Sequence, residues 1–121
     1  MLASLGVRSV QSRVNRGVVY LDRKFPDWET YVELENLDMG DSDSCVIAQI
    51  FGEYWQGIER LFWLRRRLHK LFGYVFYTIR PAYYGFHAFS FDDLEYARLT
   101  TAWKTVITMR QAHARMQKDA A

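Results

Sequence analysis

The most reactive side chains in this sequence are one cysteine, Cys45, and three histidines, His69, His87 and His113. Cys45 begins a stretch with helical apolar spacing, and the positive end of a helix dipole lowers the pKa of a thiol. A thiolate nucleophile would also need a base such as His87 or His113 beside it, which spacing alone does not establish. A lone cysteine among apolar residues is more often a small buried side chain. We therefore predict no catalytic residue and no enzymatic activity.

A metal site is not indicated by the sequence either. The histidines lie far apart, and neither the His-x-x-x-His nor the Cys-x-x-Cys spacing occurs. Asp38, Asp41 and Asp43 lie close together, but they lack the glycine and the distal glutamate of a calcium loop. Such acids are typical of a solvated loop that caps a helix. The sequence thus predicts no metal ligand and no cofactor.

A DNA-binding pattern is also present, although it is loose. A helix-turn-helix needs a small residue, a glycine four positions later and an aliphatic residue six positions beyond it, and Ala48, Gly52 and Ile58 have this spacing. The second helix would then present Gln56 and Arg60 to DNA. Against this stand Glu53, where an apolar residue is usual, Gly57 inside the second helix, and the surrounding acids, which oppose contact with phosphate.

Charge is strongly segregated along the chain, although the formal net charge is only +2. Residues 27–59 contain nine acidic residues and no Lys or Arg, whereas residues 60–80 contain six Lys or Arg and no acidic residue. The basic stretch also carries aromatic side chains, and we predict that it binds a partner. Its predicted contact residues are Arg60, Phe62, Trp63, Arg65, Arg66, Arg67, Lys70 and Tyr74.

Three interpretations of this basic stretch stay open. It could bind nucleic acid by aromatic stacking, or residues 60–72 could form a helix on an anionic membrane surface. It could instead pair with residues 27–59, within one chain or between subunits, and the opposite charges favour this third interpretation. Exposed aromatic residues beside arginines are typical of protein interfaces. We therefore predict a non-enzymatic interaction module that binds another protein or forms a homo-oligomer, with a helix-turn-helix regulator and a peripheral membrane protein as alternatives.

Apolar spacing predicts a mainly α fold, with three or four helices in one domain over residues 1–121. The first helix spans Ser9 to Lys24 and ends before Pro26, because proline disfavours helical geometry in the residue that precedes it. Pro26 and Asp27 can themselves open a short helix. The acidic connection that follows, over 33–44, is expected to be pinned to the core by Leu34, Leu37 and Met39.

Another helical pattern starts at Cys45, with Ser42 or Ser44 as its expected N-cap and with Gly52 and Gly57 as expected breaks. The last helix is expected to follow a cap at Ser90 or Asp92. Between these helices, residues 72–89 form either a small β-hairpin or an irregular connection. The predicted core consists of Val14, Val18, Leu21, Trp28, Ile47, Ile50, Phe51, Tyr54, Leu61, Leu64, Leu99, Trp103 and Ile107.

Composition excludes several classes of protein. With 121 residues, half of them apolar, the chain can bury a core without a disulfide or a metal. A single cysteine excludes an internal disulfide and favours a reducing compartment. No stretch approaches the roughly 20 apolar residues that a membrane-spanning helix needs.

The order of several fragments resembles a family of small proteins encoded by phages of actinobacteria, including mycobacteriophages. These fragments are GVVYLD at 17–22, PDW at 26–28, LENLDM at 34–39, CVIAQIFGEYWQG at 45–57, GF at 85–86 and YARLTTAW at 96–103. The resemblance is weak over 62–84, and Ser42 stands where many relatives have a second cysteine. It implies a phage gene product in the cytoplasm of a bacterial host, and it implies no particular activity.

Overall fold

The computed structural model describes residues 2–62, 80–90 and 92–120, and within these ranges the regular structure is entirely helical. Two long helices, α1 (Leu2–Lys24) and α6 (Asp93–Ala120), form the framework. Shorter elements cover one side of them: α2 (Val46–Phe51), α3 (Tyr54–Leu61), α5 (Arg80–Tyr83) and two 3-10 turns, η1 (Trp28–Tyr31) and η2 (Leu34–Asn36). The prediction of a small, mainly α fold is confirmed.

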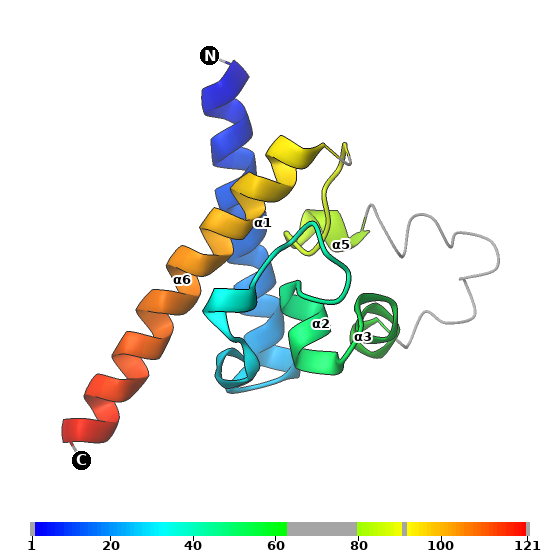
Figure 1. The fold of residues 1–121 in the computed structure, drawn as a ribbon. Helices are drawn as coiled ribbons and strands as arrows, with labels where there is room; N and C mark the ends of the chain where they lie inside the picture. The colour runs from blue at the N-terminus through cyan, green and yellow to red at the C-terminus, as the bar shows by residue number, and fades with distance from the viewer. Residues whose placement is uncertain (1, 63–79, 91, 121) are drawn as a thin grey trace.

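Helices α1 and α6 cross and run in the same general direction (Figure 1). Two ion pairs between the helices show this orientation. Arg13 meets Glu95 at 2.9 Å near the start of α6, and Asp22 meets Arg110 at 2.6 Å about four turns further along. Since parallel helices cannot be joined by a short turn, the intervening chain has to return to the start of the pair, and on its way it covers the apolar faces of both helices.

The apolar face of α1 consists of Val10, Val14, Val18 and Leu21, and that of α6 of Leu99, Trp103 and Ile107; all seven are buried. No residue of α6 after Ile107 is buried, and the C-terminal part of this helix extends beyond the other elements (Figure 1). The amphipathic spacing of the sequence therefore identified the correct inner faces.

Pro26 ends α1 as predicted, since the helix stops at Lys24 and Phe25 still donates its N–H to the Leu21 carbonyl. Trp28 follows in η1 and is fully buried. Its indole N–H donates to Asp22 at 2.9 Å, and its ring packs edge-on against Trp103 with 5.8 Å between ring centroids. The short helix after Pro26 thus brings a large side chain to the crossing of α1 and α6.

The acidic connection over 33–44 is anchored as expected. Leu37 and Met39 are buried, and Leu34 packs against the core from a half-buried position. The Met39 N–H donates to the Thr100 hydroxyl of α6 at 2.9 Å. The acids of this segment project outward, because the apolar residues between them occupy the inner positions.

The N-cap of α2 differs from the prediction. Cys45 occupies this position, and its sulfur accepts the Ala48 N–H at 3.5 Å, whereas neither Ser42 nor Ser44 caps the helix. The Ser44 hydroxyl instead donates to Asp41. At the last helix the expectation holds, since the Asp92 carboxylate accepts the Leu94 N–H at the start of α6.

The helical pattern that starts at Cys45 breaks at Gly52 and Glu53, and it does not break at Gly57. Gly52 has a φ of +98°, which favours glycine, whereas Gly57 lies inside α3. A Cβ atom at Gly57 would overlap the side chain of Ile47 and lie 2.9 Å from Phe51. The second glycine is therefore required by close packing of α3 on α2.

Over residues 80–90 the structure shows no hairpin strand, and at Phe62 it corrects an expectation. Residues 82–89 do not form a return strand, because Arg80–Tyr83 is helical and turns and bends follow it; the other half of the suggested hairpin lies outside the described residues. Phe62 is buried, with 4% of its surface exposed, because Tyr20 stacks on its ring at 5.1 Å and Tyr84 lies at 5.9 Å.

The predicted core is otherwise confirmed for the described residues, with Ile50 and Phe51 only partly buried at its edge. Leu64 lies outside the described ranges.

Candidate functional site

The buried position of Cys45 removes the thiol from consideration as a nucleophile. The side chain is buried, and desolvation raises the pKa of the Cys45 thiol to about 11. Hydrogen bonds from backbone N–H groups at the start of α2 lower this pKa, but by less than burial raises it. At neutral pH the group stays a thiol and serves as a helix cap.

The two histidines within the described residues, His87 and His113, lie apart and do not form a metal site. His87 is buried, its Nδ1 lies 2.7 Å from the Ala88 carbonyl oxygen, and burial lowers its pKa. His113 is exposed on α6, and His69 lies outside the described residues. Among residues 2–62, 80–90 and 92–120, no three His, Cys, Asp or Glu side chains converge as metal ligands would.

The outer face of α3 is the candidate interaction surface. The inner face of this helix is buried through Tyr54, Gly57, Ile58 and Leu61, and the outer face presents Trp55, Gln56 and Arg60. Trp55 is 46% exposed, whereas Trp28 and Trp103 are fully buried. The Arg60 guanidinium lies 5.6 Å from the Phe25 ring centroid and 5.5 Å from that of Phe51, so its position is restrained by cation–π contacts.

Of the predicted partner-binding residues, the structure places Arg60 on this surface and removes Phe62 from it, because Phe62 belongs to the core. Trp63, Arg65, Arg66, Arg67, Lys70 and Tyr74 lie outside the described residues. Sequence reasoning missed Trp55. Its signal was available, because Trp55 follows Tyr54 of the apolar seam and is therefore rotated about 100° away from the buried face.

The same two helices form the predicted helix-turn-helix corner. Ala48 and Ile58 are buried, Gly52 forms the turn, and Gln56 and Arg60 are exposed. The turn that carries Asp41 and Asp43 lies directly beside this corner, since the Tyr54 N–H donates to the Ser42 carbonyl at 3.2 Å. Asp41 and Asp43 therefore lie near the end of α3 that would enter a DNA groove, where they would repel phosphate.

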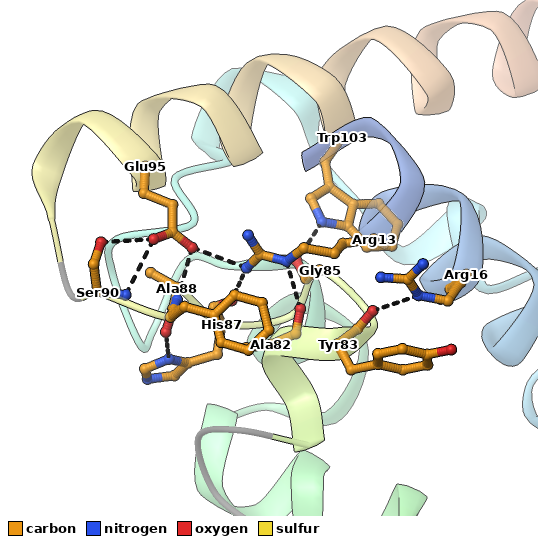
Figure 2. Close-up of polar contacts among 11 residues, drawn as sticks. Arg13, Arg16, Ala82, Tyr83, Gly85, His87, Ala88, Ser90, Glu95 and Trp103 are labelled. Carbon is orange, nitrogen blue, oxygen red and sulfur yellow. Dashed lines mark hydrogen bonds and ion pairs between the residues drawn. The ribbon is translucent and has the colours of Figure 1, made fainter. Parts of the chain in front are cut away.

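A network of polar contacts around Arg13 positions the segment over 80–90 on α1 and α6 (Figure 2). The Arg13 side chain, only 3% exposed, donates to the carbonyl oxygens of Ala82 and His87 at 2.7 Å each and pairs with Glu95. Burial alone would raise the pKa of Glu95, but hydrogen bonds from Ser90, the Phe89 N–H and Arg13 outweigh burial and hold this pKa below its usual value.

Glycine permits this close approach. A Cβ atom at Gly17 would overlap the Tyr84 carbonyl oxygen, and Gly85, with a φ of +73°, lies against the α1 backbone at Val14. The Trp103 indole N–H donates to the Gly85 carbonyl at 2.7 Å (Figure 2). The segment is thereby tied to both long helices.

None of the described helices is both long enough and apolar enough to cross a membrane. Comparison of the chain with protein-family models, with curated proteins and with solved structures found no significant match.

Proposed function

We propose that this chain is a non-enzymatic interaction module that binds a host or phage protein through the outer face of α3. The observation that carries this proposal is the exposed outer face of α3, which presents Trp55 at one edge, Arg60 at the other and Gln56 between them. Tryptophan and arginine dominate the binding energy of protein interfaces. The buried inner face of α3 holds these side chains on a rigid support, so little conformational entropy would be lost on binding.

The sequence after α3 contains the same residue types as the outer face of α3. They include Trp63, Arg65, Arg66 and Arg67. A partner with an apolar pocket rimmed by acidic groups would complement such a surface. The resemblance to actinobacterial phage proteins supports a phage or host protein as this partner.

The test compares two double variants, each of which replaces one large apolar residue and one arginine by alanine. Trp55→Ala/Arg60→Ala alters the α3 surface, and Met116→Ala/Arg115→Ala alters exposed residues of α6. Immobilised wild-type protein is used to capture a partner from a nuclease-treated lysate of phage-infected actinobacteria. The captured protein is then purified, and its affinity for each variant is measured by calorimetry.

Loss of a tryptophan and an arginine at the centre of an interface costs about 2 kcal/mol or more, which is roughly 30-fold in Kd. We expect this loss for the α3 variant and wild-type affinity for the α6 variant. Equal affinities of the two variants, with helical content unchanged by circular dichroism, would contradict the proposal.

A helix-turn-helix regulator is the second candidate, and the observed turn at Gly52 between α2 and α3 favours it. It predicts a DNA shift at low salt that weakens steeply as salt is added and that depends on Gln56 and Arg60. Absence of any shift at low salt would remove this candidate. The acids beside α3 are the reason that we rank it second.

A further inference from the structure

A second surface lies where α5 and the loop after it cover α1. We call it the α1–α5 surface and define it by Arg16, Tyr83 and Phe89. The two aromatic residues are each half exposed. Arg16 of α1 donates from Nε to the Tyr83 carbonyl oxygen at 2.9 Å (Figure 2), and its guanidinium carbon lies 3.9 Å from the centroid of the Tyr83 ring. Phe89 covers Arg13 in the same manner at 4.4 Å.

The Arg16 guanidinium is held in place, but only some of its N–H groups donate hydrogen bonds. One hydrogen bond and one stacking contact restrain its guanidinium, and no described residue accepts a hydrogen bond from its two terminal amino groups. The edge formed by these two amino groups matches the geometry of a carboxylate. The half-exposed Tyr83 and Phe89 would supply apolar contact around such a pair.

The same chain carries the complementary charge in its acidic connection. Exposed acids over 27–43 form what we call the acidic segment: Asp27, Glu33, Glu35, Asp38, Asp41 and Asp43. None of these six carboxylates forms an ion pair with a described Lys or Arg. Local hydrogen bonds shape the segment, for example those that Asp41 accepts from the Asp43 N–H and the Ser44 hydroxyl. The exposed ring of Tyr31 lies in the same stretch of chain.

We propose that the α1–α5 surface of one copy binds the acidic segment of a second copy. Both partners of the contact are present at equal concentration in any solution of this chain, and their charges are opposite. Because the two surfaces differ, the contact either closes a ring, of which a two-fold dimer with two reciprocal contacts is the smallest, or extends into an open chain. This self-association goes beyond the proposed function, since it uses neither Trp55 nor Arg60.

Sedimentation velocity of the wild-type chain tests the proposal first. We expect mass to increase with concentration at about 0.1 M salt, where the Debye length is about 10 Å, and to return to the 14.4 kDa monomer near 1 M salt, where it is about 3 Å. Arg16→Gln keeps a donor for the Tyr83 carbonyl but removes the guanidinium. We expect it to weaken association about 30-fold, whereas Arg115→Gln on exposed α6 leaves association unchanged.

A mixing experiment shows whether the contact is heterologous. Arg16→Gln leaves the acidic segment intact, and Glu35→Lys/Asp43→Lys leaves the α1–α5 surface intact while sparing the side chains that shape the loop. Each variant alone should stay monomeric. Their mixture should form a 1:1 dimer of about twice 14.4 kDa that grows no further, because the remaining two surfaces are the altered ones.

The proposal is overturned if the wild-type chain stays monomeric at low salt, if either folded variant assembles like the wild type, or if the mixture does not dimerise. A monomeric wild type that still binds a partner through Trp55 and Arg60 would reject self-association and leave the proposed function intact. If the chain assembles in an Arg16-dependent manner but binds no partner through Trp55 and Arg60, the proposed function is rejected and self-association is kept.

Discussion

Replacing Arg13 with methionine tests whether the buried network between α1, α5 and α6 stabilises the fold. Methionine has a similar length and no hydrogen-bond donor. The change removes the ion pair to Glu95 at 2.9 Å and the hydrogen bonds to the carbonyl oxygens of Ala82 and His87 at 2.7 Å. Since the Arg13 side chain is only 3% exposed, water cannot easily replace these partners.

The loss of unfolding free energy depends on how well the Glu95 carboxylate is compensated once Arg13 is removed. Removing one partner of a buried ion pair costs about 3–5 kcal/mol, because the other charge is left without compensation. Glu95 is 16% exposed and keeps its hydrogen bonds from Ser90 and the Phe89 N–H, which reduces that cost. We therefore expect a loss of about 3 kcal/mol in the free energy of unfolding, a large share of the 5–15 kcal/mol that is typical of a domain.

Urea unfolding measures this loss, with far-UV circular dichroism reporting the helices and tryptophan fluorescence reporting the packing around Trp103. Arg115→Met on exposed α6 is the matched control and should change the unfolding free energy by less than about 0.5 kcal/mol. In Arg13→Met/Glu95→Gln no buried carboxylate charge remains, so the double variant should lose less than the sum of the single changes. A loss below about 1 kcal/mol for Arg13→Met would refute the reasoning, because the network would then be no stronger than a surface ion pair.

The three remaining predictions concern pH, the thiol and one glycine. The lowered pKa of His87 stabilises the fold above pH 6.5, and this stability is lost as the pH falls below 6.5. The lowered pKa of Glu95 stabilises the fold above pH 4.5, and this stability is lost as the pH falls below 4.5. Urea unfolding across pH should show both losses, and Glu95→Gln should abolish the loss below pH 4.5. Cys45 should react with iodoacetamide far more slowly in the folded chain than in urea; equal rates would contradict its burial. Gly17→Ala should lower the thermal midpoint, despite the roughly 1 kcal/mol helix preference of alanine, because its Cβ would overlap the Tyr84 carbonyl; a raised midpoint would contradict that packing.

Local rules were sufficient for much of the helical framework. Pro26 restricts the residue before it, Gly52 permits a positive φ, and Asp92 offers a carboxylate to the first turn of α6; each effect depends on neighbours within a few positions. The alternation of apolar residues also identified the buried faces of α1 and α6. These features can be predicted from the sequence because backbone conformation and helical periodicity are short-range properties.

The errors arose where a distant segment supplied the environment. Phe62 was predicted to be exposed beside a basic stretch, yet Tyr20 of α1 and Tyr84 of the loop after α5 enclose its ring. Cys45 took the N-cap position from two serines, because the buried packing of the segment around α2 favours a small apolar side chain there. The sequence likewise gave no sign that Arg13 is buried, because the carbonyl groups of Ala82 and His87 that accept its hydrogen bonds lie about 70 positions away.

Sequence alone thus determined the helical class, the inner faces of the two long helices and the separation of acidic from basic segments along the chain. Tertiary structure decided which charged and aromatic side chains are buried and which are exposed: Arg13 and Phe62 are buried, Arg16 is partly buried, and Trp55 is exposed. The physical reason is that burial depends on which distant segment covers a residue. The parallel arrangement of α1 and α6 brings the 80–90 segment over α1, a contact about 70 positions apart in sequence that no local spacing encodes.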